Sequence, residues 1–134
     1  MVIDSSALLA VLMMEPEAVP FADAIERDPI RLVSTLSALE ASTVIGSRRG
    51  PAGVGDLDLL LYRIGAELVA FNREQFEIAR SAYSRFGKGK HPAALNLGDC
   101  CSYALAVASG EPLLAKGNDF PRTDARLVSS SNSA

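Results

Sequence analysis

The chain has 134 residues, of which 49% are hydrophobic, and its formal net charge at pH 7 is −3. A chain of this length and composition can bury a core large enough to fold as one compact domain, so it requires neither disulfides nor a structural metal. The acidic balance argues against a protein that coats nucleic acid by charge alone, although it leaves room for an enzyme with a local basic patch.

Short β-type runs alternate with helix-length segments along the first half of the chain. The predicted elements are, in order, a strand at 1–3, helices at 5–14 and 17–27, a strand at 30–33 and a helix at 37–48. In the second of these helices, apolar residues recur at helical spacing until Pro29 stops the pattern. The Arg-Gly-Pro sequence at 49–51 is a breaker that predicts the end of the third.

The second half of the chain continues the alternation. The predicted elements are a helix at 53–65, a strand at 67–71, a helix at 72–86, a polar and basic loop at 88–98, a helix at 99–109, a strand at 112–115 and a short edge strand at 126–128. Asn72 can cap the helix at 72–86 and Gly87 can end it. Its apolar stripe, which includes Phe76 and Tyr83, is expected in the core, as is Tyr62.

This alternation is typical of an α/β fold with a mostly parallel sheet, here of four to five strands. The sequence has no internal repeat and no linker, so we expect one domain at 1–128 and a disordered tail at 129–134. The apolar start of the chain meets a carboxylate at Asp4, which a signal-peptide core would not carry, and the apolar runs are too short to span a membrane. We therefore expect a soluble, cytoplasmic protein with no membrane contact.

The cysteines and the histidine exclude several kinds of site. Cys100 and Cys101 are adjacent, so they are poorly placed to bridge each other, and they lack the spacing of a zinc site. We expect both to be small core residues of a helix in a reducing compartment. His91 is the only histidine, so a mechanism that pairs two histidines for metal-free RNA cleavage is impossible within this chain.

Four carboxylates lie near strand ends. Asp4 follows the first strand, Glu40 lies early in the helix after the second strand, and Asp119 follows the strand at 112–115. Ligands of open α/β sheets bind at the carboxyl ends of the strands, so these residues are candidates for one site. Asp99 opens the helix that leads into the last of these strands, and it joins them only if the loop before it reaches the same edge of the sheet.

Each carboxylate also has a purely structural interpretation. Asp4 and Asp99 could cap the helices that they precede, and Glu40 could form a capping box with Ser37. Asp119 lies in an Asn-Asp turn, where aspartate is common. The sequence leaves these alternatives open.

Clustered carboxylates raise one another's pKa and cannot all remain ionised without a cation. Mg²⁺ resolves this conflict because it prefers oxygen ligands and is usually held by one or two carboxylates together with waters and substrate phosphate. An ion of this kind polarises a phosphoryl group and activates water, so the site needs no histidine.

Four segments of the chain resemble the motifs of a PIN-domain ribonuclease, and most closely those of the VapC toxins of bacterial toxin–antitoxin pairs. They are Val-Ile-Asp-Ser-Ser-Ala-Leu at 2–8, Ser-Ala-Leu-Glu-Ala at 37–41, Leu-Gly-Asp-Cys at 97–100 and Leu-Ala-Lys-Gly-Asn-Asp-Phe at 114–120. The resemblance covers the chain from Met1 to about Val128, and the four motifs occur in the right order at suitable spacing.

The resemblance implies a three-layer α/β/α fold and Mg²⁺, or Mn²⁺ in its place, bound chiefly by Asp4 and Asp99. Glu40 and Asp119 would complete the acidic pocket. The family's members cut single-stranded or loop regions of structured RNA, often tRNA or rRNA, and so inhibit translation. The resemblance further implies a homodimer and a cognate VapB-type antitoxin that inserts a segment into the active-site groove. Some relatives carry an acidic residue at the position of Asn118, which here could orient a water molecule.

The hypothesis for the reaction is an in-line displacement in which water attacks an RNA phosphate. Asp4 and Asp99 would be the ligands of the ion, and Glu40 would orient or deprotonate the attacking water. Asp119 would hold water or a second ion. Ser6 could hydrogen-bond one of the carboxylates, or it could simply be a serine at a helix start.

Basic side chains near helix ends and in loops are candidates for binding the RNA backbone. They are Arg48, Arg49, Lys88, Lys90, His91 and Lys116. Contacts of this kind position RNA without reading its sequence, and Lys116 is the first choice because it precedes Asp119 at a strand end. The alternative for each is ordinary solvated surface charge. The sequence shows no aromatic platform for stacking single-stranded bases.

Three other classes of protein share some of these features. A response-regulator receiver would place a pair of acids after its first strand and a phosphate-accepting Asp after its third, and this chain has neither. A haloacid-dehalogenase-like phosphatase would carry a second Asp two residues after the first, where this chain has Ser6. The main alternative is a non-catalytic PIN-fold module that binds RNA or protein, because a fold alone does not establish a function.

Overall fold

A computed structural model of the chain describes residues 1–129. Its strands are β1 (Val2–Ile3), β2 (Leu32–Ser34), β3 (Glu67–Val69) and β4 (Leu113–Leu114). Its helices are α1 (Ser5–Leu12), α2 (Ala18–Arg27), α3 (Thr35–Arg63), α4 (Arg73–Phe86) and α5 (Leu97–Ser109), followed by the 3₁₀ turn η1 (Phe120–Arg122). No helix within residues 1–129 is long and apolar enough to cross a membrane.

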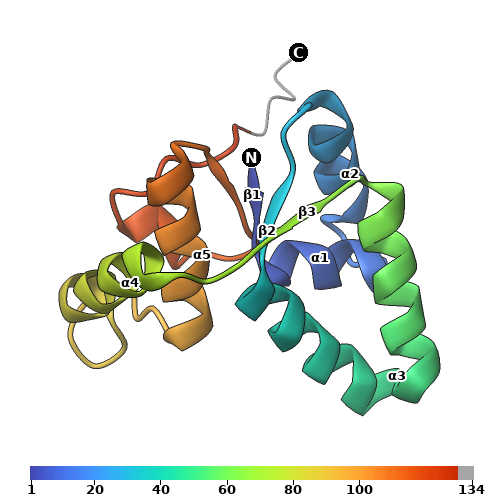
Figure 1. Ribbon diagram of the computed structural model, residues 1–134, viewed down its shortest axis with the longest axis horizontal. Helices are drawn as coiled ribbons and strands as arrows, with labels where there is room; N and C mark the ends of the chain where they lie inside the picture. Colours follow the sequence, from blue (N-terminus) through green and yellow to red (C-terminus); the bar gives the residue numbers. More distant parts are fainter. Residues whose placement is uncertain (130–134) are drawn as a thin grey trace.

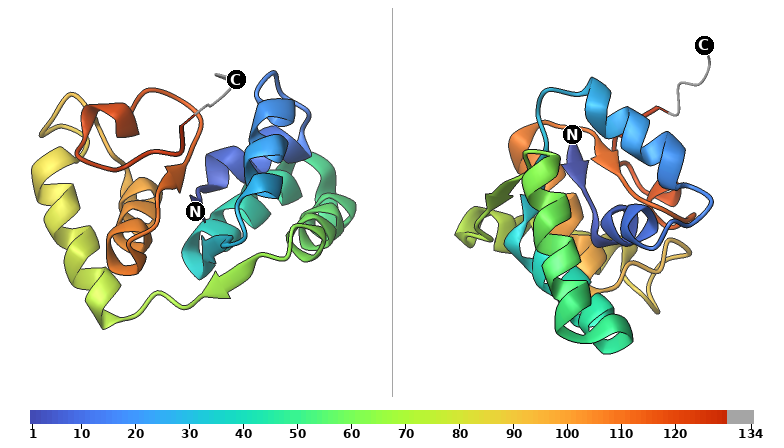
Figure 2. Two further views of the ribbon diagram at one scale, coloured as in Figure 1. Left: turned by 90° about the horizontal axis from the view of Figure 1, so that it is seen from above. Right: turned by 90° about the vertical axis from the view of Figure 1, so that its right-hand side faces the viewer.

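The strands form one parallel sheet in the order β3-β2-β1-β4 (Figure 1). Helices α1, α2 and α3 cover one face, and α4 and α5 cover the other (Figure 2). Val2 packs into the core on the α4 and α5 side, whereas Met1 and Ile3 pack on the opposite side, because successive side chains of a strand point to opposite faces. The predicted three-layer α/β/α fold with a parallel sheet is confirmed.

Helix α5 begins at the edge of the sheet where the strands end, as the site hypothesis required (Figure 1). Strand β4 runs parallel to β1, and only residues 110–112 separate it from α5, so the helix runs antiparallel to the strands. Asn96 caps the start of α5, and Gly110, with φ of 74°, ends it in the left-handed conformation that favours glycine. The chain therefore carries Asp99 to the edge that Asp4 occupies.

The break predicted between helices at 37–48 and 53–65 is confirmed: α3 consists of two helical halves that meet at a kink at Gly50. Gly50 has φ of 66° and ψ of −157°, a conformation that side chains with a Cβ disfavour, and Pro51 starts the second half. Proline is tolerated in the first turn after such a break because the N–H that it lacks would have no helical partner there. The Arg-Gly-Pro sequence therefore ends the first half of α3, and the second half begins directly after it.

Two predictions need correction. The edge strand predicted at 126–128 is reduced to one parallel bridge between Leu113 and Leu127. Phe76, Tyr83 and Tyr62, which were expected in the core, are 45%, 38% and 83% exposed. In α4 the core is made by the smaller Ala79 and Ala82, together with the partly buried Ile78 and Phe86. Residues 130–134 of the predicted tail lie outside the described part of the chain.

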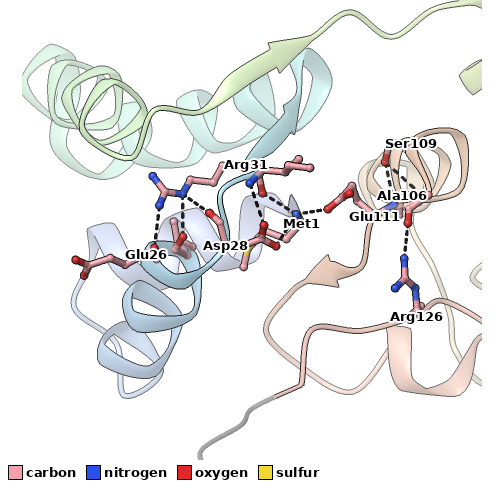
Figure 3. A network of polar contacts seen from close by, with 11 residues as sticks. Met1, Glu26, Asp28, Arg31, Ala106, Ser109, Glu111 and Arg126 are labelled. Carbon is pink, nitrogen blue, oxygen red and sulfur yellow. Dashed lines mark hydrogen bonds and ion pairs between the residues drawn. The ribbon is translucent and has the colours of Figure 1, made fainter.

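A network of polar contacts joins the starts of the strands at the opposite edge of the sheet (Figure 3). The amino group of Met1 donates hydrogen bonds to Asp28 at 2.9 Å and Glu111 at 2.6 Å. Arg31 donates to backbone carbonyls at the end of α2 and, at 2.9 Å, to that of Ile64. The bonds of Met1 tie the loop after α2 and the approach to β4 to the first strand, and those of Arg31 tie the ends of α2 and α3 to the start of β2.

The kink in α3 gives a test of the fold. We expect Gly50→Ala to lower the free energy of unfolding by about 1–3 kcal/mol, because the backbone at residue 50 must stay in a conformation nearly reserved for glycine. Gly55→Ala in the same helix has open space for a Cβ and no positive φ, so it should raise stability by up to about 1 kcal/mol. Urea denaturation measures both, and equal effects of the two substitutions would contradict this account of the kink.

Candidate active site

The structure gathers the four predicted carboxylates at the carboxyl edge of the sheet. Asp4 directly follows β1, Glu40 lies in the second turn of α3, Asp99 lies in the first turn of α5, and Asp119 follows β4. The pKa of Asp99 is raised to about 6, chiefly by burial and further by the negative charges of Asp4, Asp119 and Glu40. Since these charges act on one another, the edge of the sheet forms a single electrostatic unit.

Asp4 is the most deeply buried of the four, with 3% of its surface exposed. Its Oδ2 accepts hydrogen bonds from the N–H of Ser6 at 3.0 Å and the hydroxyl of Ser6 at 2.7 Å. Its Oδ1 accepts the hydroxyl of Ser102 at 2.5 Å. The bond from the Ser6 N–H makes Asp4 the N-cap of α1, so its structural interpretation holds together with its place in the cluster.

Glu40 is held from two sides. Its Oε1 accepts the hydroxyl of Ser5 at 2.7 Å. A Cβ added at Gly98 would lie 2.5 Å from the same oxygen, so the glycine is what lets the start of α5 approach the carboxylate this closely. The proposed capping box between Glu40 and Ser37 is wrong, because Ser34 caps α3 and Ser37 bonds Ser102 instead.

Asp99 and Asp119 occupy the more open side of the cluster. Asp99 is the third residue of α5 and not its cap: its side chain accepts the N–H of Asn96 at 3.0 Å, while the side chain of Asn96 accepts the N–H of Asp99 at 2.8 Å. This reciprocal pair fixes the Asp99 side chain at the helix start. Asp119 is exposed, makes no side-chain capping bond to η1, and lies beside the exposed Asn118.

Lys116, the first choice for an RNA contact, is engaged elsewhere in the structure. Its Nζ forms ion pairs with Glu15 at 2.8 Å and Glu17 at 3.7 Å, both in the segment between α1 and α2. The hydrogen bond to Glu15 is the main cause that raises the pKa of Lys116. Its backbone N–H donates to the hydroxyl of Ser6 at 2.9 Å, so Lys116 connects the loop of Asp119 to the residue that holds Asp4.

The other basic candidates lie in two separate regions. Arg48 and Arg49 are exposed just before the kink of α3. Lys88, Lys90 and the half-buried His91 lie in the loop between α4 and α5. The kink and this loop lie on opposite sides of the carboxyl edge in Figure 1, so the structure does not join the candidates into one patch.

The two cysteines are buried, as expected for core residues of a helix. Burial raises the pKa of each thiol to about 11, and the charge of Asp99 adds to this for Cys100. For Cys101 the added charges are those of Glu40 and Asp4. Both thiols are therefore protonated at neutral pH and serve neither as nucleophiles nor as thiolate ligands.

The sequence interpretation missed Ser102, Ser5 and Gly98, which shape the cluster, and gave Ser37 only a capping role. Ser102, Ser37 and Ser5 supply hydroxyls, and Gly98 supplies space. Ser102 stands three residues after Asp99, on the same face of a helix, and this spacing was the one signal that could have pointed to it. The others depend on contacts between distant segments.

The donor set suits a hard cation. Within residues 1–129, no group of three or more aspartate, glutamate, histidine or cysteine side chains is arranged to hold a metal ion by itself. Mg²⁺ does not need such a cage, because it is usually held by one or two carboxylates with waters and phosphate completing the shell. The carboxylates of Asp4, Glu40 and Asp119, whose negative charges help to raise the pKa of Asp99, supply oxygen ligands for an ion of this kind.

The electrostatic strain at Asp99 can be measured. Because the pKa of Asp99 is near 6 in the folded chain and 3.8 normally, its ionised form opposes folding above about pH 6, and this penalty fades as the pH falls toward 3.8. We expect Asp99→Asn, which keeps an acceptor for Asn96, to raise the melting temperature by about 2–6 °C at pH 7.5 in EDTA.

Asp124→Asn serves as the control of opposite sign. A hydrogen bond from Tyr103, helped by Arg85, lowers the pKa of Asp124, so loss of this charge should lower the melting temperature. A wild-type chain that melts above the Asp99→Asn variant in EDTA would show that the cluster is not under strain.

Comparison with known proteins gives the family. The family model of the PIN domain matches residues 1–126. The chain is 53% identical over 128 residues to a VapC ribonuclease of Mycobacterium bovis and to ribonuclease VapC30 of Mycobacterium tuberculosis, with 96% of this chain and 98% of each relative covered. It is 52% identical to ribonuclease VapC of Mycolicibacterium smegmatis, with 96% and 99% covered.

Solved structures agree on the fold. VapC20 of Mycobacterium tuberculosis, described as a sarcin-ricin loop cleaving toxin, matches with a TM-score of 0.74 and 16% identity, over 92% of this chain and 95% of the other. VapBC2 from Rickettsia felis, solved with a DNA fragment from its promoter, matches with a TM-score of 0.76 and 12% identity, over 96% of each chain. On its sequence and its fold, the chain belongs to the PIN-domain family, in the group of the VapC proteins.

Proposed function

We propose that the chain is a Mg²⁺-dependent endoribonuclease, the toxin of a toxin–antitoxin pair, which hydrolyses RNA phosphodiester bonds and inhibits translation. The observation that carries this proposal is the position of Asp99 among three further carboxylates: burial raises its pKa to about 6, and their negative charges add to the rise. Relatives at 52–53% identity are named ribonucleases, which supports the activity on RNA.

Asp4 and Asp99 would hold the ion, with Mn²⁺ able to replace Mg²⁺. The hydrogen bonds to Asp4 occupy both lone-pair positions of Oδ2 and one of Oδ1, which leaves Oδ1 able to accept a cation. Asp99 faces the more open side and is only half-buried. When bound, the ion polarises the phosphoryl group and offsets the charge that develops during displacement.

Glu40 would orient the attacking water and take its proton, since Ser5 and the approach at Gly98 fix this carboxylate beside the other acids. The oxygen of the water forms the new bond to phosphorus as the bond to one ribose oxygen breaks on the opposite side. Asp119, exposed in the loop after β4, would bind water at the open side, and Asn118 could help to orient it.

The proposed substrate is a loop or single-stranded region of tRNA or rRNA. VapC20, which shares this fold, is described as cleaving the sarcin-ricin loop, which is consistent with structured RNA as the class. Arg48, Arg49, Lys88 and Lys90 are the candidates for phosphate contacts, because all four are exposed and flank the acidic edge.

Two partners complete the proposal. A VapB-type antitoxin would place a segment in the active-site groove, and the match to the VapBC2 structure supports a partner of this type. A second copy of the chain would form a homodimer. Exposed apolar side chains of α3, α4 and α5 supply a surface for it beside the acidic edge: Leu36, Leu39, Phe76, Tyr83 and Leu97, most of which line one apolar hollow.

RNA cleavage tests the activity. Purified chain, freed of any partner, should cut total cellular RNA at discrete sites in Mg²⁺ or Mn²⁺, and EDTA should abolish the cuts. Because Asp99 would be a ligand, Asp99→Asn should lower the rate by at least about 100-fold. Asp58→Asn, an exposed site on α3, should leave the rate unchanged.

Each other outcome has a defined meaning. Cuts that persist in EDTA would reject a metal-dependent mechanism. No cuts from a folded chain, with RNA of the source organism among the substrates, would favour the alternative of a non-catalytic PIN-fold module that binds RNA or protein.

Light scattering tests the homodimer. Leu97 is 77% exposed at the start of α5, so Leu97→Glu should convert a dimer of about twice the chain mass to a monomer. Val19→Glu on α2 changes a side chain that is 70% exposed elsewhere and should leave the dimer intact. A monomeric wild type, or a dimer unaffected by Leu97→Glu, would contradict this surface as the interface.

A further inference from the structure

Two buried hydroxyls form a chain that ends on Asp4. Ser102 and Ser37 are 0% and 1% exposed, and their Oγ atoms lie 2.9 Å apart. The Oγ of Ser102 also lies 2.5 Å from Oδ1 of Asp4. Hydroxyls buried this completely are retained only when they are hydrogen-bonded, because an unpaired one is costly.

Counting protons gives the direction of these bonds. A serine hydroxyl has one proton to donate, and an ionised carboxylate can only accept. Ser102 must therefore donate to Asp4, so its bond with Ser37 is one in which Ser37 donates and Ser102 accepts. Each bond polarises the next, and the whole chain points its positive ends toward the carboxylate.

The same pair joins the elements that carry the other carboxylates. Ser37 stands three residues before Glu40 in α3, and Ser102 stands three residues after Asp99 in α5, which places each serine on the same helical face as its acid. The contact between the two serines thus sets the separation of α3 and α5 where they present Glu40 and Asp99, and ties both helices to the end of β1.

We propose that Ser102, supported by Ser37, is a positioning residue that fixes the Asp4 carboxylate and the α3–α5 spacing for binding a divalent cation. This inference rests on the proposed function and adds the device that aligns its ligands. Removal of groups that orient metal ligands typically weakens metal binding by about 10–100-fold.

The test is a titration of the chain with Mn²⁺, followed by electron paramagnetic resonance, which needs no RNA cleavage. We expect Ser102→Ala to raise the dissociation constant for Mn²⁺ by about 10-fold. Ser37→Ala should raise it by about 3-fold, because Ser102 then keeps its own bond to Asp4. Ser102→Thr retains the hydroxyl and should stay within about twofold of wild type.

Ser34→Ala is the matched control. Ser34 is also fully buried, but its hydroxyl caps α3 by accepting the N–H of Leu36. Its loss should lower the melting temperature and leave the Mn²⁺ constant unchanged. In cleavage assays, Ser102→Ala should raise the metal concentration for half-maximal rate and leave the KM for RNA unchanged.

The outcomes separate the inference from the function on which it rests. Wild type that binds no Mn²⁺ would overturn the proposed metal site and the inference with it. Wild type that binds Mn²⁺, with Ser102→Ala unchanged or Ser34→Ala equally impaired, would overturn the inference alone. If Ser102→Ala does not fold, Ser37→Ala and Ser102→Thr decide by the same constants.

Discussion

Repulsion among carboxylates at one edge of the sheet is the constraint on which the rest of the structure depends. Four acids converge there, and their charges add to the effect of burial in raising the pKa of Asp99 and of the thiols of Cys100 and Cys101. Hydroxyl and N–H donors offset part of this cost at Asp4 and at Glu40. Helices α1, α3 and α5 also begin at this edge, and the positive ends of their dipoles favour negative charge. A bound cation would offset the part of the repulsion among the carboxylates that these donors and dipoles leave.

The sequence predicts much of this arrangement, because the rules it follows are local. Asp4, Glu40 and Asp119 stand out because each follows a strand, and the carboxyl ends of parallel strands meet at one edge. Asp99 needed knowledge of topology, since a residue at a helix start reaches that edge only if its helix runs antiparallel to the next strand. The same local rules locate the break in α3 at Gly50 and Pro51, but they did not predict that the second helical half would begin at once, without an intervening loop.

Other features were beyond reach because they depend on contacts between distant segments. The spacing of apolar residues in α4 identifies a helix and a stripe, but it does not fix how much of the stripe the next layer covers. In the structure Ala79 and Ala82 face the core while Phe76 and Tyr83 remain partly exposed. Ser37 and Ser102 are 65 residues apart in the chain. Their hydrogen bond depends on the packing of α3 against α5, which the sequence of neither helix predicts by itself.

The contacts of Lys116 in the structure differ from the role that its position in the sequence suggested. Its place before Asp119 suggested a phosphate contact, yet its ammonium lies between Glu15 and Glu17, and its backbone N–H bonds Ser6. A lysine paired with two carboxylates adds no net positive charge, so this side of the site is also acidic. Under the proposed function, RNA would meet a negative centre flanked by basic residues, and its phosphate would gain a favourable partner there only once a cation is in place. The cation would therefore bind at the acidic edge before the RNA does.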